Sequence, residues 1–229
     1  SSRKEAGVPR RHRPLLSGCS ESEQSAVIAQ ARANLQAAGA GDIRSFRAGS
    51  YSANRTTLRV LADLGISFDS SYNPCYAESV PDLPPPRQRL QPMAMDGVWE
   101  FPVSFFSDYP GHFRHAQLCA CSFREMRAAL EGAHAAGWFA FVIVLHSGEL
   151  IKRQVGESGG LTVAPDRVNI RRFEQLCQFL GNNRDRFETG TFHGLDPAAV
   201  PALAPTQALR SRLWRTAHRF VEQTASRFL

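Results

Sequence analysis

The sequence predicts an α/β fold in which mostly parallel strands form an open sheet or an incompletely closed barrel. Segments typical of strands and of helices alternate along the chain, with about five strands in all. A strand, a helix and a second strand follow one another within residues 43–69, which is the spacing of a βαβ unit. The apolar run 139–145 is typical of a strand buried at the centre of such a sheet.

The first elements follow from local signals. Residues 1–20 are rich in arginine and lysine without an apolar period, so we expect a basic, disordered arm. Residues 21–38 repeat apolar side chains at helical spacing after a capping serine, which predicts a helix. We expect a strand at 43–47, a helix at 56–64 that Gly65 ends, and a strand at 66–69.

The middle of the chain alternates in the same way. Five prolines within residues 81–92 predict an extended loop, because proline fixes φ and lacks a backbone donor. Residues 98–106 are typical of a strand, with Pro102 at an edge or a bulge. A helix is expected over 122–136, because Ser122 and Glu125 match a capping box.

The C-terminal part continues the pattern. After the apolar run we expect a flexible loop at 156–160, a helix at 169–180 and a last strand at 186–192. A linker and an amphipathic helix from residue 206 follow. Its expected apolar face comprises Leu209, Leu213, Ala217, Phe220, Val221 and Phe228, with Arg210, Arg212, Arg215, Arg219 and Arg227 mainly on the other. These patterns divide the chain into an arm (1–20), a main domain (21–195) and a tail (196–229).

Composition narrows the range of functions. The longest apolar run has eight residues, against about 20 for a membrane-spanning helix, so no transmembrane segment is expected. Five cysteines without a CxxC pair favour reduced thiols and a cytoplasmic location. The formal charge of +6 comes mostly from scattered arginines, which indicates a solvated basic surface more than a nucleic-acid site. The chain starts without Met, so a fragment or a processed form is expected.

Two residues that follow predicted strands are candidates for chemistry. His146 comes directly after the apolar run 139–145, at the carboxyl edge where parallel α/β sheets place reactive groups. Arg47 follows the strand at 43–47 and precedes small residues that let a ligand approach the backbone. We expect both at one mouth of the sheet. A hydrogen-bonded structural histidine and a surface arginine in an ion pair are the alternatives.

Several stretches, in the same order along the chain, resemble motifs of the polysaccharide deacetylases, also called the NodB-homology group. The third motif region of that family is similar to Phe46-Arg47-Ala48-Gly49-Ser50-Tyr51 and, further on, to Gly65-Ile66-x-x-Asp69-Ser70-Ser71. Later strands of the family resemble Glu100-Phe101-Pro102-Val103 and the Leu-His motif at Leu145-His146-Ser147-x-Glu149. The resemblance implies an incomplete (β/α) barrel of the NodB deacetylase type.

This resemblance also implies a reaction, the removal of acetyl groups from an N-acetylated polysaccharide by water that a divalent metal such as zinc activates. By analogy His146 is the general acid, and its ordinary pKa near neutrality suits that task. Leu145 lines the pocket for the acetyl methyl group, and Arg47 orients the aspartate base through a charge-assisted hydrogen bond. Tyr51 lies near the sugar, although the family pattern puts the aromatic one residue earlier.

The metal ligands and the base of the family are missing from this pattern. No Asp-Asp pair occurs in the sequence, and Arg11 and Arg13 stand where relatives carry histidines, with His12 between them. Arginine stays protonated and cannot bind a cation. His112 and His115 are interpreted as surface-loop residues, so no metal ligand is assigned.

We therefore expect a deacetylase-type domain without its N-terminal strands. It should be inactive alone, and its open strand edges should cause marginal stability or self-association. A non-catalytic carbohydrate-binding remnant and a basic accessory protein at a membrane surface are the alternatives.

Overall fold

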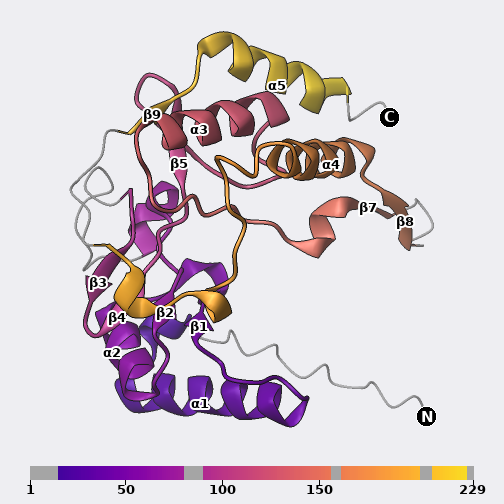
Figure 1. The fold of residues 1–229 in the computed structure, drawn as a ribbon. Coiled ribbons are helices and arrows are strands. Elements are labelled where there is room, and N and C mark those ends of the chain that lie inside the picture. Colours follow the sequence, from indigo (N-terminus) through magenta and orange to yellow (C-terminus); the bar gives the residue numbers. More distant parts are fainter. Residues whose placement is uncertain (1–14, 80–89, 156–160, 202–207, 226–229) are drawn as a thin grey trace, which may run out of the picture.

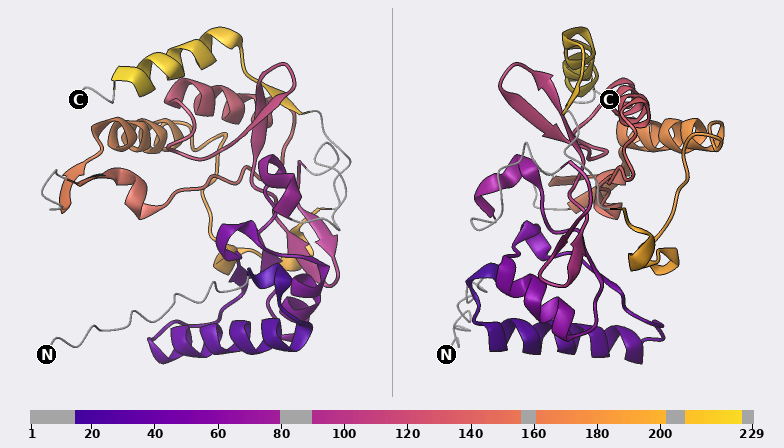
Figure 2. Two further views of the ribbon diagram at one scale, coloured as in Figure 1. Left: turned by 180° about the vertical axis from the view of Figure 1, so that it is seen from behind. Right: turned by 60° about the vertical axis from the view of Figure 1, so that its left-hand side comes forward.

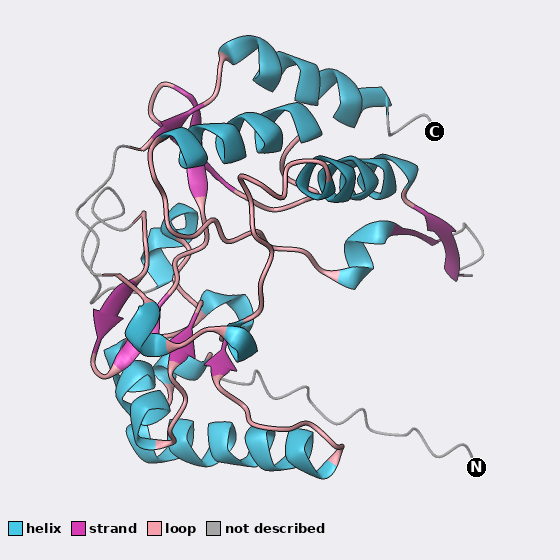
Figure 3. Ribbon diagram, in the orientation of Figure 1, coloured by secondary structure: helices cyan, strands magenta, loops and turns pink. Residues whose placement is uncertain are grey.

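The computed structural model has a mixed α/β fold (Figure 1). It describes residues 15–79, 90–155, 161–201 and 208–225. Helices α1 (Glu21–Ala37) and α2 (Arg55–Asp63) lie at one end of the molecule, and α3 (Phe123–Ala135), α4 (Arg167–Gly181) and α5 (Leu213–Ala225) lie together at the other (Figure 2). Loops and short strands fill the space between these ends (Figure 3). The predicted α/β class is confirmed.

The predicted βαβ unit forms at the first end. Strands β1 (Ser45–Phe46), β2 (Phe68–Asp69) and β4 (Val98–Glu100) are parallel, and β3 (Met93–Met95) pairs antiparallel with β4. Helices α1 and α2 pack below this sheet around a core that includes Ile28, Leu58, Leu61, Ile66 and Val98. The carboxyl ends of the three parallel strands therefore share one edge of the sheet.

Capping residues fix the helix ends as the sequence predicts. Ser20 and Ser122 each accept a hydrogen bond from the backbone of the third helical residue. The carboxylates of Glu23 and Glu125 accept the backbone N–H of these serines, which completes the capping boxes. Gly65 ends α2 with φ +74°, a left-handed conformation that is costly for other residues. These bonds join groups only a few residues apart, so local sequence determines them.

A second sheet supports the helices at the other end. Strand β5 (Phe105–Tyr109) pairs antiparallel with β6 (His112–His115) and parallel with β9 (Leu209–Arg210). The expected strand 98–106 is therefore split, since Pro102 lies between β4 and β5. Helices α3 and α4 cover a core that includes Phe106, Met126, Leu130, Leu176, Phe179 and Leu209. The tail is thus part of this packed unit.

A third sheet, the antiparallel hairpin of β7 (Ile151–Val155) and β8 (Leu161–Pro165), lies apart from the other two. Among the described strands, three pairings are parallel and three antiparallel, so the expectation of mostly parallel strands is wrong. The described strands close no barrel. No helix in the described ranges is long and apolar enough to cross a membrane.

The apolar run 139–145 is not the central strand that the sequence predicts. Among the described residues, an isolated bridge between Val144 and Gln117 is its one sheet-like pairing, and the Val142 carbonyl oxygen also accepts the Ser104 N–H (3.1 Å). Several of its backbone groups bind side chains instead, as where Phe139 N–H donates to Gln91 (2.7 Å) and Val142 N–H donates to Ser104 (2.8 Å). Without a continuous ladder on either side, the extended segment stays partly exposed.

Three further expectations change. Residues 187–191 have no regular secondary structure, and Phe192 begins a 3-10 turn (Phe192–Gly194), so the expected strand at 186–192 does not form. Residues 15–20 of the expected arm pack on the body, where Ser17 and Ser52 hydroxyls lie 2.7 Å apart. The last helix begins at Leu213 instead of residue 206. The expected loops at 81–92 and 156–160 lie largely or wholly outside the described residues.

Helix α5 also turns the opposite face inward from the one its sequence predicts. Arg219 is 2% exposed, whereas Phe220 is 55% and Val221 68% exposed. Arg219 donates to Glu125 (3.0 Å) and to Asp108 (3.0 Å), both fully buried. The buried carboxylates on α3 and β5 therefore decide which side of α5 docks.

Candidate functional site

The carboxyl ends of β1, β2 and β4 bring together the residues that the sequence marks as strand ends. The Arg47 guanidinium donates to the Ser70 carbonyl oxygen (2.8 Å) and hydroxyl (2.7 Å). The Ser70 hydroxyl donates to the Phe101 carbonyl oxygen (2.8 Å). The loops that follow all three strands are thus tied into one edge, and Arg47 is held in place by charge-assisted bonds.

Two carboxyl groups are buried under this edge. Asp69 and Glu100, each 1% exposed, form a side-chain hydrogen bond with each other. Burial raises the pKa of Asp69, although hydrogen bonds from Glu100 and Ser71 partly oppose this. Burial of two neighbouring carboxyl groups disfavours the ionisation of both at once. Glu100 also accepts the Tyr72 N–H (3.1 Å), which fixes the turn after β2.

Tyr51 is presented by an unusual turn. Ser50 and Tyr51 have φ values of 54° and 56°, a left-handed conformation that costs non-glycine residues about 1 kcal/mol or more. This turn stacks the Tyr51 ring on Tyr76, with ring centroids 5.6 Å apart and planes 20° apart. Burial raises the pKa of the Tyr51 hydroxyl, and a hydrogen bond with Asn73 and the charge of Arg47 oppose this. Consecutive strained residues that position one aromatic ring are typical of a functional site.

A row of side chains extends from these two tyrosines. The Tyr76 ring contacts His115 with centroids 5.3 Å apart, and His115 Nε2 lies 2.6 Å from Gln117 Oε1. The Gln117 amide donates to Glu149 Oε1. We call Tyr51, Tyr76, His115, Gln117 and Glu149 the aromatic row. It joins the end of the first sheet to the segment that contains the predicted Leu-His motif.

Environment determines the ionisation of this row. Burial lowers the pKa of His115, and the charge of Arg114 lowers it further, while the hydrogen bond with Gln117 opposes them. The charge of Arg47 lowers the pKa of the Tyr51 hydroxyl, and the charge of Glu149 raises it. The row therefore combines an exposed aromatic surface, since Tyr76 is 51% exposed, with amide and carboxylate groups.

The predicted residues His146 and Leu145 lie at the rim of this region. Both are exposed, Leu145 by 39%, and they follow an extended segment instead of a central strand. His146 is linked to the row through its backbone, because its carbonyl oxygen accepts the Glu149 N–H (2.9 Å). The structure thus places Arg47 and Tyr51 within the site, with His146 and Leu145 beside it.

The described residues do not fit the metal that the resemblance implies. In the described ranges, no three His, Cys, Asp or Glu side chains lie close enough together to hold an ion. His112 and His115 are separated by an odd number of positions in strand β6 and so point to opposite faces. His112 contacts Asp108 instead (2.5 Å). His12 lies outside the described residues.

Sequence reasoning missed several members of the row. Tyr76 and Gln117 had no motif around them, and His115 was interpreted as a surface-loop residue although it ends β6. Glu149 was quoted only as part of the Leu-His motif. A signal existed for Asp69 and Glu100, which are the last residues of β2 and β4.

Comparison of the chain with family models, with curated proteins and with solved structures found no match.

Proposed function

We propose that this chain is a polysaccharide deacetylase-like domain that binds an N-acetylated sugar polymer along the aromatic row. The stacked pair of Tyr51 and Tyr76 carries the proposal, because a strained turn holds the Tyr51 ring against the Tyr76 ring, which is partly exposed. Sugar rings stack on such surfaces through their apolar faces, as aromatic side chains combine an apolar body with polar edges. The motif resemblance around Arg47 and His146 supports the same substrate class.

Polar groups along the row supply hydrogen bonds for the hydroxyl and acetamido groups of a sugar. Glu149 is held by Gln117 and by the Cys119 N–H (3.3 Å), so its carboxylate has a fixed position. Arg47 positions the loop that carries Tyr51. His146, an exposed residue whose carbonyl oxygen accepts the Glu149 N–H (2.9 Å), is the proposed proton donor to the leaving amine. The family's metal would activate the attacking water, but the described residues assign it no ligands.

Titration calorimetry with N-acetylglucosamine oligomers tests the binding. Tyr76→Ala should weaken binding about 3- to 10-fold, the loss of one favourable ring contact. Tyr109→Ala is the matched control, because Tyr109 is 42% exposed on β5 and stacks on His112 outside the row. Equal affinities for both variants would refute the proposed site.

Acetate release from the same oligomers, measured with added zinc, separates the deacetylase from its alternative. Release that His146→Ala reduces would support the proposed proton donor. Tight binding without any release would favour the non-catalytic carbohydrate-binding domain, which uses the same row without chemistry.

A further inference from the structure

The way α5 docks has a consequence for the molecular surface. Arg219 and Thr216 hold the polar side of α5 against the body. Arg219 donates to Glu125 and Asp108, and the Thr216 hydroxyl donates to the Asp108 carbonyl oxygen (3.1 Å). The apolar side then faces outward over residues 213–221. We call its large residues the apolar ridge; they are Leu213, Trp214, Phe220 and Val221, between 50% and 68% exposed.

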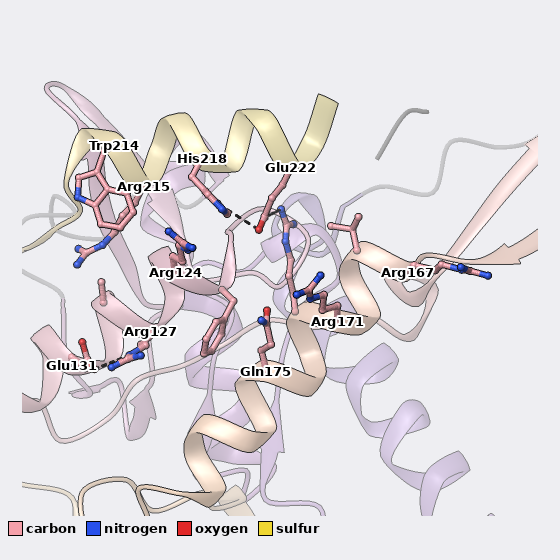
Figure 4. A pocket seen from close by; sticks show the side chains of 14 residues that line it. Arg124, Arg127, Glu131, Arg167, Arg171, Gln175, Trp214, Arg215, His218 and Glu222 are labelled. Atoms are coloured by element: carbon pink, nitrogen blue, oxygen red, sulfur yellow. Dashed lines mark hydrogen bonds and ion pairs between the residues drawn. The ribbon is translucent and has the colours of Figure 1, made fainter. Parts of the chain in front are cut away.

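A basic groove runs beside this ridge, between α3, α4 and α5 (Figure 4). Its volume is about 880 Å³. We call it the arginine groove; its arginines are Arg124, Arg127, Arg167, Arg171, Arg172 and Arg215. The lining acids are Glu131 and Glu222, and these already bind Arg127 (2.9 Å) and Arg172 (2.9 Å). The groove therefore carries an excess of positive charge that the described residues do not neutralise.

One buried donor of the groove lacks a partner. Arg172 is 3% exposed, and its Nη atoms bind the Cys119 carbonyl oxygen (3.1 Å) and Glu222. Its buried Nε has no hydrogen-bond partner among the described residues. An unsatisfied buried donor costs about 1–3 kcal/mol, more when charged. Guanidinium groups suit phosphate because their planar fork of N–H donors can bind two phosphate oxygens at once.

Trp214 connects the ridge with the groove. Its side chain is 50% exposed on the ridge and also lines the groove. The Arg124 and Arg215 guanidinium carbons lie 5.9 Å and 5.2 Å from the centre of its ring. Tryptophan with flanking arginines is typical of side chains at the boundary between water and lipid.

We propose that the apolar ridge and the arginine groove together form a docking surface for an anionic phospholipid membrane. The ridge inserts into the boundary between headgroups and acyl chains, and the groove arginines bind the headgroup phosphates. Charge complementarity favours this occupant over a second copy of the chain, whose groove would bring like charges together. The exposed apolar ridge favours lipid over nucleic acid, because a phosphate backbone would leave the ridge uncovered.

Sedimentation with vesicles tests the proposal on the full chain. We expect binding to vesicles of equal parts phosphatidylcholine and phosphatidylglycerol, weaker binding at high salt, and little binding to phosphatidylcholine alone. Arg124→Gln with Arg215→Gln should weaken binding about fivefold for each arginine, so about 25-fold together. Phe220→Ser with Val221→Ser should weaken it at least about tenfold.

Matched controls lie at the opposite end of the molecule. Arg44→Gln with Arg59→Gln removes the same charge, and Val27→Ser with Leu35→Ser removes apolar side chains that are 57% and 52% exposed on α1. Both controls should bind vesicles as the wild type does, and circular dichroism should show all variants folded.

Three outcomes would overturn the proposal. The first is that the wild-type protein does not bind anionic vesicles, whereas inorganic phosphate or duplex DNA protects Arg124 and Arg215 from chemical modification. The second is equal vesicle binding by ridge, groove and control variants. The third is a wild-type dimer that the ridge substitutions convert to monomers without a change in vesicle binding, which would assign the ridge to contact between copies.

Discussion

Replacing Arg219 by methionine tests which face of α5 docks on the body. Arg219 is 2% exposed and binds two fully buried carboxylates, Glu125 and Asp108, at 3.0 Å each. Removing one partner of a buried ion pair costs about 3–5 kcal/mol, because the remaining charges stay buried. Asp108 keeps Arg114 (2.7 Å) and His112, and Glu125 keeps the Ser122 N–H (2.9 Å), so we expect the lower end, about 3 kcal/mol.

Urea denaturation followed by circular dichroism measures this loss. With a slope of about 2 kcal/mol per molar urea, Arg219→Met should lower the midpoint by about 1.5 M. Phe220→Ser on the neighbouring position should change the free energy of unfolding by about 0.5 kcal/mol or less, since that side chain is 55% exposed. The reverse order, a small effect at Arg219 and a large one at Phe220, would mean that α5 docks with its apolar face and that the structural reasoning is wrong.

Three further predictions concern buried groups. Asp69→Asn should gain stability relative to the wild type as pH rises above 3.8. Burial raises the folded-state pKa of Asp69, so the wild type loses free energy of unfolding as pH rises from 3.8 through that folded-state pKa, whereas asparagine does not titrate. A difference between the urea midpoints of the two proteins that does not depend on pH would contradict this. Exposed Cys177 should react with iodoacetamide much faster than buried Cys121, because burial raises the pKa of the Cys121 thiol to about 12. Equal labelling rates of the two thiols in mass spectra would refute the packing around Cys121. Phe68→Ala should cost about 3–5 kcal/mol in thermal or urea unfolding, since Phe68 is fully buried between Phe101 and Phe192; a loss under 1 kcal/mol would exclude this aromatic core.

Part of the candidate site could be predicted from the sequence. Arg47 and Tyr51 follow a strand that the pattern predicted, and the structure ties their loop to the residues after β2 and β4. Tyr76, His115 and Gln117 could not be found in this way, because they come from separate loops and a hairpin that only the folded chain brings into contact. His146 was placed after a strand that does not form, since the backbone of 139–145 binds the side chains of Gln91 and Ser104 instead of a continuous ladder.

The sequence by itself determined the capped ends of the helices, because these depend on bonds between residues a few positions apart, such as Ser122 with Glu125. It also indicated the βαβ unit through the alternation of strand and helix patterns, although the pairing of Ser45 with Phe68 joins residues farther apart. Only the tertiary structure decided which face of α5 is buried. The amphipathic pattern of that helix predicts docking through its apolar face, whereas Arg219 is buried and Phe220 is 55% exposed. Its orientation depends on Asp108 and Glu125, which lie 111 and 94 positions before Arg219. Buried carboxylates need a cation more than the body needs further apolar cover, so the arginine turns inward and the apolar ridge stays exposed.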